Sequence, residues 1–166
     1  MTRPKISLKA GAEPLYEKCW TPQSLCGEIP EGEKMSTFAT TEEAREYFMN
    51  DLFASRAGMR LDELTDDSAV CSVEITEALQ NANGGVMGGA IFTLADLALA
   101  AIANNIHKPS VASQVSINYL SAPKGTKLIA KAGVVKSGRT TTVIRVDVTD
   151  DAGRDVALFI GTAFKL

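Results

Sequence analysis

The sequence contains few of the side chains that bind metals or form disulfides. Its 166 residues include one histidine, His107, and three cysteines, Cys19, Cys26 and Cys71, none of which forms a CxxC pair. A zinc site built on histidines is therefore excluded, because such a site takes several ligands at short spacing. One thiol must stay unpaired within the chain, and no apolar secretory segment follows Met1. We therefore expect no bound metal and a location in the reducing cytoplasm.

The sequence also lacks a large excess of charge of either sign. Seventeen Lys and Arg residues against 20 Asp and Glu give a formal net charge of -3, with a pI near 5.2. A nucleic-acid-binding domain usually carries a basic face, so this balance gives no support to nucleic-acid binding. The hydrophobic content of 45% and charged content of 22% are typical of a soluble globular protein, and the length suits one domain.

Residues 1–39 lack a sustained hydrophobic period and hold four of the six prolines. We expect an extended arm there, followed by one domain over residues 40–166. The arm is nevertheless too apolar for a free tail, so part of it should lie on the domain or on a partner subunit. The apolar side chains concerned are Leu15, Tyr16, Trp20, Leu25 and Phe38.

Apolar patterns divide the rest of the chain into two helices and six strands. A capping box from Thr40 to Glu43, followed by apolar residues at helical spacing, predicts a helix over residues 41–55. A longer apolar run predicts a second helix over residues 87–104. The predicted strands cover residues 59–63, 69–75, 111–119, 126–136, 142–148 and 156–164. In the third strand, one face should carry Val111, Ser113, Val115, Ile117 and Tyr119. This order indicates an α+β fold whose antiparallel sheet curls round one buried helix.

The most informative stretch is residues 81–105, which combines clustered glycines with a long apolar run. Glycines at positions 84, 85, 88 and 89 indicate a backbone that bends sharply or approaches another group closely. The run that follows, Ala90 to Ala103, holds one charge, Asp96, and should form a helix buried nearly all round. A carboxylate there is costly unless it is paired or used, so Asp96 is the leading candidate for chemistry.

On a helical projection, Asp96 shares a small, polar face with Gly89, Thr93 and Ala100. The opposite face suits packing against a sheet and carries Ile91, Leu94, Ala95, Ala98 and Ile102. The glycines lie where the first turn of a helix leaves backbone N–H groups without acceptors, which favours an anion or an oxyanion. A carbonyl held there could be polarised while Asp96 supplies a base or a nucleophile.

Two simpler interpretations of this stretch compete with a catalytic one. Asp96 could hydrogen-bond a neighbouring backbone group and have no further role. Residues 86–103 could also be a membrane span, because the run is 18 residues long. The central Asp, the glycines and the small side chains argue against insertion, so we expect no membrane partner.

The motif Asn81-x-x-Gly84-x-x-Met87-Gly88-Gly89, followed by Leu-Ala-Asp ending at Asp96, resembles a known family signature. It is similar to that of hotdog-fold acyl-CoA thioesterases of the phenylacetate-degradation (PaaI-like) type. The family pattern is Asn-x-x-Gly-x-x-His-Gly-Gly followed closely by Leu-Ala-Asp, and the resemblance covers about residues 41–166. One position departs, because Met87 stands where the family has His. The resemblance implies a hotdog fold, a curled antiparallel sheet wrapped around one long central helix.

The resemblance also implies a reaction, the hydrolysis of an acyl-CoA thioester with a medium-chain or aryl acyl group. The backbone N–H of Gly88 would polarise the carbonyl, and Asp96 would activate water or attack directly. Asn81 matches the asparagine that orients the water or the thioester. In the family these groups come from two subunits, so we expect a homodimer or homotetramer with the site at the interface. No cofactor is expected beyond the coenzyme A of the substrate.

The remaining substrate-binding candidates follow from position. Ser113 lies beside Ala112, the position that corresponds to a hydroxyl often found early on the third strand in the family. Lys136 and Arg139 flank a turn and could meet the phosphates of coenzyme A, although two basic residues at a turn are often only solvated. The full set of expected substrate contacts is Met87, Gly89, Thr93, Ser113, Lys136 and Arg139.

Other functions stay open at this point. Because Met87 stands where the family has His, one alternative is a non-catalytic acyl-CoA-binding module with a regulatory role. A hotdog hydratase would require a His near an Asp, and His107 is badly placed for it. A purely structural assembly protein is a further alternative, and a DNA-binding regulator is disfavoured because the short arm is broken by prolines and not basic.

Overall fold

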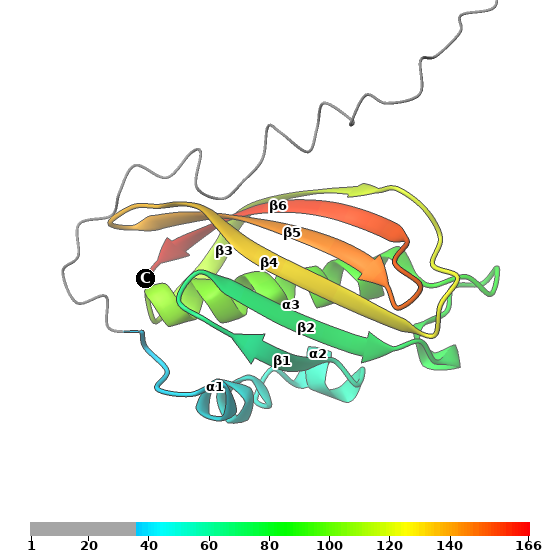
Figure 1. Ribbon diagram of the computed structural model, residues 1–166, viewed down its shortest axis with the longest axis horizontal. Helices are drawn as coiled ribbons and strands as arrows, with labels where there is room; N and C mark the ends of the chain where they lie inside the picture. The colour runs from blue at the N-terminus through cyan, green and yellow to red at the C-terminus, as the bar shows by residue number, and fades with distance from the viewer. Residues whose placement is uncertain (1–35) are drawn as a thin grey trace, which may run out of the picture. The chain divides into compact units, whose positions relative to one another are not determined.

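A computed structural model describes residues 36–166, so most of the expected arm lies outside the described residues. The elements are α1 (Thr41–Phe48), α2 (Leu52–Arg56), β1 (Arg60–Leu64), β2 (Ser68–Glu74), η2 (Glu77–Leu79), α3 (Gly88–Ile106), β3 (Ser110–Tyr119), β4 (Lys127–Ser137), β5 (Thr141–Asp150) and β6 (Asp155–Lys165). The strands form one sheet in the order β1-β2-β4-β5-β6-β3, and every neighbouring pair is antiparallel. Figure 1 shows this sheet curled over α3. The predicted α+β class and hotdog arrangement are confirmed.

Period-two alternation explains how the sheet covers α3. On β5, the side chains of Thr142, Ile144, Val146 and Val148 are all buried, while the residues between them are partly open. The same alternation continues through the register, where Ala130 of β4 lies opposite Val148. One face of the sheet therefore forms the core, and the other meets solvent.

The sheet-facing side of α3 was predicted correctly. Ile91, Leu94, Ala95, Ala98 and Ile102 are buried against the strands. Close contact requires a glycine on β6, because a Cβ on Gly161 would lie 2.2 Å from Leu99 Cδ1.

The other side of α3 is less covered than expected, since Thr93, Asp96 and Ala100 are only half-buried. Length and composition alone would suit α3 to a membrane span. Its burial inside the sheet accounts for the same apolar character.

The first predicted helix is two helices. α1 ends at Phe48 and α2 begins at Leu52, because residues 49–51 form a tight turn in which the Asn50 N–H donates to the Tyr47 carbonyl and the Asn50 side chain does the same. Asn and Asp compete with helix in this way, which the apolar spacing did not register. The break turns α2 toward the start of α3.

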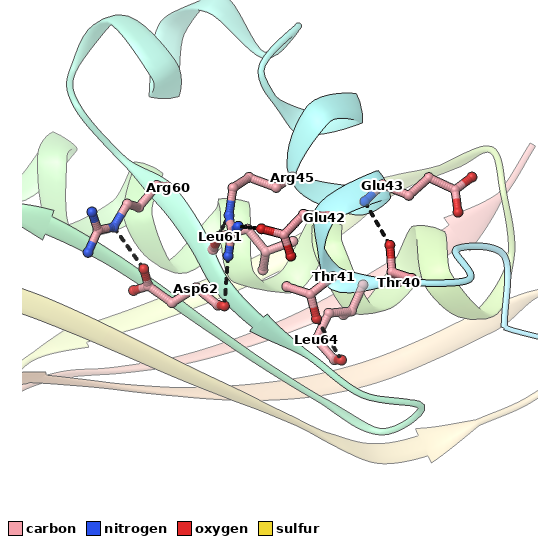
Figure 2. Close-up of polar contacts among 9 residues, drawn as sticks. All are labelled: Thr40, Thr41, Glu42, Glu43, Arg45, Arg60, Leu61, Asp62 and Leu64. Atoms are coloured by element: carbon pink, nitrogen blue, oxygen red, sulfur yellow. Dashed lines mark hydrogen bonds and ion pairs between the residues drawn. The ribbon is translucent and has the colours of Figure 1, made fainter.

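The start of α1 is the capping box that the sequence predicts. The Glu43 N–H donates to Thr40 Oγ1 at 3.1 Å, and the Glu43 carboxylate accepts from the Ala39 N–H at 2.8 Å. Figure 2 shows how α1 is then fixed to β1. Arg45, which also pairs with Glu42, donates through Nε to the Leu61 carbonyl at 2.7 Å and through Nη2 to the Asp62 carbonyl at 3.0 Å.

The residues just before α1 belong to the core. The Phe38 side chain is buried, and its N–H donates to Asn105 Oδ1 at 3.2 Å. The Lys108 ammonium lies 4.7 Å from the Phe38 ring centroid and 3.8 Å from that of Tyr47.

Burial raises the pKa of the Cys71 thiol on β2, which is an unreactive side chain of the core.

The predicted face of β3 is wrong at its start. A bulge between Ala112 and Gln114 places Ser113 outside the regular register, so Val111 pairs opposite the exposed Phe164 rather than sharing a face with Val115. The bulge is fixed by a hydrogen bond from Ser113 Oγ to the Thr162 carbonyl at 3.0 Å. A simple alternation of apolar residues cannot reveal such an insertion.

Candidate active site

The glycine loop before α3, residues 81–87, folds around Asn81. The Asn81 N–H donates to the Gly85 carbonyl at 2.8 Å, and the Gly84 N–H donates to the Asn81 carbonyl at 3.0 Å. Asn81 Oδ1 accepts from the N–H groups of Asn83 at 2.9 Å and Gly85 at 3.3 Å. Gly84 has φ +77°, a left-handed conformation that favours glycine. Within one chain, the side-chain oxygen of Asn81 therefore holds the loop.

The start of α3 leaves backbone donors free. Met87 is the N-cap residue and makes no side-chain capping bond, while its carbonyl accepts from the N–H groups of Ala90 and Ile91. The N–H groups of Gly88 and Gly89 have no acceptor among residues 36–166. These are the unpaired donors that the first turn of a helix offers to an anion.

The two glycines of this turn differ in their surroundings. The Tyr119 hydroxyl donates to the Gly88 carbonyl at 3.0 Å, and a Cβ on Gly88 would lie 3.2 Å from the Tyr119 ring. A Cβ on Gly89 would lie at ordinary contact distance, 3.5 Å from Met87 Cε. The Gly89 carbonyl accepts from Thr93 Oγ1 at 2.8 Å. A side chain at position 88 would therefore require the Tyr119 ring to shift by a few tenths of an ångström, whereas Gly89 stands on the more open side of the helix.

Asp96 lies seven residues beyond Gly89, about 10 Å further along the helix axis at 1.5 Å per residue. Its carboxylate accepts no hydrogen bond and forms no ion pair within the described part of the chain, which contradicts the interpretation that it only bonds a neighbouring backbone group. Burial raises the pKa of Asp96 above its ordinary 3.8, and the nearby Asp51 carboxylate raises it further. A half-buried carboxylate without a partner is costly for stability, and such groups are typical of functional sites.

Two cavities open on different faces of the first turns of α3. The apolar cavity, of about 720 Å³, lies under α2 and is lined by Leu52, Phe53, Arg56, Ala57, Met59, Ala78, Leu79, Met87, Gly89, Ala90, Phe92 and Thr93. The loop cavity, of about 390 Å³, is lined by Asn81, Gly85, Val86, Gly88, Ile91 and residues 119–123. The structure therefore groups Met87, Gly89 and Thr93 on one side of the helix start and Asn81 with Gly88 on the other.

Three predicted substrate contacts lie away from both cavities. Lys136 and Arg139 flank the β4–β5 turn, which approaches the other end of α3, where His107 Nε2 lies 2.9 Å from the Gly138 carbonyl. At 1.5 Å per residue α3 is about 28 Å long, so these cations are far from Gly88 in the same chain. Ser113 lies at the bulge of β3, and its hydroxyl is bonded to Thr162.

Three residues near the glycine turn were not predicted as site residues, namely Tyr119 and the α2 residues Leu52 and Phe53. Tyr119 appears in the sequence only as the last residue of an alternating strand, and no local signal points to Gly88. The break between α1 and α2, which brings Leu52 and Phe53 to the apolar cavity, was signalled only by the Asn-Asp pair at 50 and 51. Among residues 36–166 no group of three His, Cys, Asp or Glu side chains is placed to hold a metal ion.

Comparison with known proteins gives this arrangement a family. The Thioesterase superfamily profile matches residues 83–157, which include α3 and strands β3 to β5. A protein of Archaeoglobus fulgidus is 32% identical over 127 residues, covering 75% of this chain and 82% of the relative. The acyl-coenzyme A thioesterase PaaI of Escherichia coli is 29% identical over 126 residues, covering 75% of this chain and 90% of that protein.

Solved structures agree with the sequence relatives. The E. coli PaaI protein from the phenylacetic acid degradation operon superposes with a TM-score of 0.69 at 26% identity, covering 77% of this chain and 96% of that one. A Streptococcus pneumoniae thioesterase protein solved with coenzyme A gives a TM-score of 0.64 at 32% identity, covering 70% and 94%. The chain therefore belongs to the thioesterase superfamily, and it is a PaaI-like hotdog thioester hydrolase.

Proposed function

We propose that the protein hydrolyses acyl-CoA thioesters to the free acid and coenzyme A. The observation that carries the proposal is the half-buried carboxylate of Asp96, which has no partner among residues 36–166, in a helix whose first turn leaves the Gly88 N–H free. The acyl-CoA class is supported by the E. coli relative named as an acyl-coenzyme A thioesterase and by the S. pneumoniae neighbour solved with coenzyme A.

The proposed chemistry uses two sets of groups near the helix start. The free N–H of Gly88 donates to the thioester carbonyl oxygen, which becomes negative when the carbonyl carbon is attacked. Asp96 takes a proton from the attacking water, or attacks directly to form an anhydride that water then opens. The C–S bond breaks and releases the coenzyme A thiolate. The thiolate takes up the proton that the water gives up, through Asp96 in the first route and when water opens the anhydride in the second. A raised pKa brings Asp96 closer to the range in which a general base works well at neutral pH.

The apolar cavity is proposed to hold the acyl group. Its lining is hydrophobic apart from Arg56 and Thr93, and its volume of about 720 Å³ accommodates a medium-chain or aryl group. Met87, whose side chain is 55% exposed, extends this apolar wall to the edge of the glycine turn. A thioether cannot donate a hydrogen bond, so Met87 favours apolar acyl groups over polar ones.

We further propose that the site is completed by a second copy of the chain. In one chain, Asn81 and Gly88 line the loop cavity, whereas Asp96 lies beyond the apolar cavity on the opposite side of the helix start. Strand β3 has β6 as its one neighbour within residues 36–166, so its outer edge is free to pair. A homodimer or homotetramer would bring Asn81 and Gly88 of one subunit toward Asp96 of another.

A site formed between two subunits would also set the role of the β4–β5 turn, which carries Lys136 and Arg139. Lys136 and Arg139 are at the far end of α3 from Gly88 of their own chain, so they can meet coenzyme A phosphates only at a site built with a neighbouring subunit. Ser113 likewise requires release from Thr162 before its hydroxyl could contact a substrate. The reaction as proposed needs no cofactor besides the coenzyme A of the substrate, and we place it in the cytoplasm.

A free-thiol assay over a panel of acyl-CoA esters tests this function. Phenylacetyl, benzoyl, hexanoyl, octanoyl, acetyl and succinyl esters should be compared, and the apolar medium-chain and aryl esters should give the highest turnover. Light scattering on the same samples should give a mass at least twice the 17.6 kDa of one chain. Tight binding of acyl-CoA with no thiol release from any ester would instead favour a non-catalytic binding module. The presence of Met87 where the family has His is the feature that suggests this alternative.

A further inference from the structure

We propose that Tyr119 is a positioning residue that fixes the direction of the Gly89 N–H, so that two backbone N–H groups, those of Gly88 and Gly89, meet the thioester oxygen. The inference rests on the proposed function in one respect, the use of the glycine turn as an oxyanion site. It concerns a residue on a different element, 31 positions away along the chain.

The geometry of one peptide group carries the inference. The Tyr119 hydroxyl donates to the Gly88 carbonyl oxygen at 3.0 Å. That carbonyl and the Gly89 N–H belong to the same planar, trans peptide group, in which they point in opposite directions. A hydrogen bond that fixes the oxygen therefore fixes the N–H as well. Donation to the carbonyl also polarises the peptide, which strengthens the N–H as a donor.

Gly88 and Gly89 are the first two residues of α3, and neither has a side chain that could hold the turn by packing. The Tyr119 bond therefore adds to the restraint that the helix itself gives the peptide between them. The N-cap residue, Met87, contributes no side-chain hydrogen bond. The next peptide is held separately, through the bond from Thr93 Oγ1 to the Gly89 carbonyl at 2.8 Å. One hydroxyl is thus placed on each glycine carbonyl, and both leave the N–H groups free.

The packing of Tyr119 against Gly88 also supports a positioning role. A Cβ on Gly88 would approach the Tyr119 ring to 3.2 Å, so the ring lies directly against this glycine. Tyr119 is nevertheless 53% exposed, and it lines the loop cavity together with Asn81. An exposed hydroxyl contributes little to the free energy of unfolding, because water replaces its hydrogen bond when it is lost. A role in orientation and a role in stability can therefore be separated by experiment.

The test is Tyr119→Phe, which keeps the ring and removes the donor, with Tyr47→Phe as the matched control. The Tyr47 ring packs on Phe38 and beneath Lys108, and its hydroxyl has no hydrogen-bond partner among residues 36–166. On the best acyl-CoA ester, Tyr119→Phe should lower kcat by about 5- to 50-fold, a fraction of the loss when an oxyanion donor is removed outright. KM should stay within about twofold, since the oxyanion exists only in the transition state. Tyr47→Phe should leave both constants and the unfolding temperature nearly unchanged.

A second measurement does not depend on turnover. In ¹⁵N–¹H spectra of the free protein, the Gly89 amide should shift in Tyr119→Phe and stay in place in Tyr47→Phe. An unchanged Gly89 amide, an unchanged kcat, or a raised KM at constant kcat in Tyr119→Phe would each overturn the positioning role. A wild-type protein that hydrolyses no ester would instead contradict the proposed function, while the amide spectrum would still decide whether Tyr119 orients the Gly88–Gly89 peptide.

Discussion

Two aspartates, Asp96 in the middle of α3 and Asp150 at the turn between β5 and β6, have opposite environments. Asp150, at the end of β5, is buried and accepts four backbone N–H groups, from Lys124 at 2.8 Å, Gly125 at 3.0 Å, Ala152 at 3.0 Å and Arg154 at 2.8 Å. Asp96 accepts none within residues 36–166. The Lys124 N–H, followed by that of Arg154, lowers the pKa of Asp150 to about 2. Burial and Asp51 raise the pKa of Asp96.

The comparison separates a structural carboxylate from one that is available for chemistry. Both aspartates are at least half-buried, so burial alone would not distinguish their roles. The distinguishing quantity is the number of donors that face the charged oxygens, which decides whether the native fold stabilises or destabilises the ionised form. Asp150 stabilises the fold by holding two segments, residues 124–125 and 152–154, on one side chain. Asp96 has no such donors within residues 36–166, and burial disfavours its ionised form.

The largest expected effect is on turnover in Asp96→Asn. The substitution keeps the shape of the side chain and removes the charge, so the rate of thioester hydrolysis should fall by roughly two to four orders of magnitude, as expected for loss of a general base. Binding of acyl-CoA should largely survive, and the unfolding temperature should stay the same or rise. Thiol release and thermal unfolding measure the two effects. Full activity in Asp96→Asn would remove the catalytic assignment and the contrast with Asp150 together.

The second effect is on stability, in Asp150→Ala. Four backbone N–H groups would lose their acceptor in a buried turn, so the unfolding temperature should drop by about 5 to 10 °C. The control is Asp147→Ala, which removes the ion pair with Arg145 on the neighbouring part of β5 and should have a much smaller effect. Kinetic constants of Asp150→Ala measured below its unfolding temperature should resemble those of wild type. An equal loss in both variants would mean that the four hydrogen bonds are not what holds this turn.

The pH dependence of stability should also distinguish Asp150 from Asp96. The folded-state pKa of Asp150 lies below its ordinary 3.8, so its contribution to stability is complete above that value and is lost as pH falls from about 4 toward 2. Wild type should therefore lose stability more steeply than Asp150→Asn over this interval. Asp96 changes the free energy of unfolding in the opposite direction. Its pKa is raised in the folded state, so its protonation at falling pH stabilises the fold. Denaturant unfolding at a series of pH values measures both slopes.

A smaller effect is expected on substrate range in Met87→His. The imidazole introduces the donor that the family pattern has at this position, and it makes the edge of the apolar cavity more polar. We expect a change of a few-fold in kcat/KM, about 1 kcal/mol, with aryl and medium-chain esters losing part of their advantage over short or polar ones. The same ester panel measures it. An unaltered ranking of esters would show that the Met87 side chain does not contact the acyl group.

The smallest effect is a displacement of the pH–rate profile in Asp51→Asn. The acid limb of wild-type kcat/KM should lie above the ordinary aspartate value of 3.8, because protonation of Asp96 removes the base. Removing the Asp51 charge should move that limb to lower pH, and burial, the larger cause, should keep it above 3.8. A limb that does not respond to Asp51 would mean that another group controls the activity.

Most of the fold could be predicted from the sequence, because strands with one buried face and a helix with an apolar side leave distinct periodic patterns. The two departures are local. Residues 49–51 interrupt a helix through side-chain and backbone bonds that compete with it, and Ser113 enters a bulge fixed by a residue on β6. Neither the helix break nor the bulge changes the spacing of apolar residues, so neither could be predicted from that spacing.

The candidate site was predictable only in part. Asp96 stands out because a charge inside an apolar helix is unusual, and Gly88 because glycines cluster before it. Tyr119 could not be predicted, since its contact with Gly88 depends on the register of β3 against β6 and on the depth of α3 in the sheet. The roles of Lys136 and Arg139 stay a prediction, because their chemistry suits phosphates while their turn lies near the end of α3, at His107 of the same chain.

The side chains that fix α1 to β1 have a consequence for how many copies can join. Arg45 and Thr41 occupy carbonyls of Leu61, Asp62 and Leu64 along the outer edge of β1. These bonds hinder the addition of a strand at that edge, so among residues 36–166 β3 offers the more open edge of the sheet. Two copies that pair β3 with β3 about a twofold axis use up both open edges at once. In such a pair, neither copy would keep a β3 edge to which a third copy could add a strand.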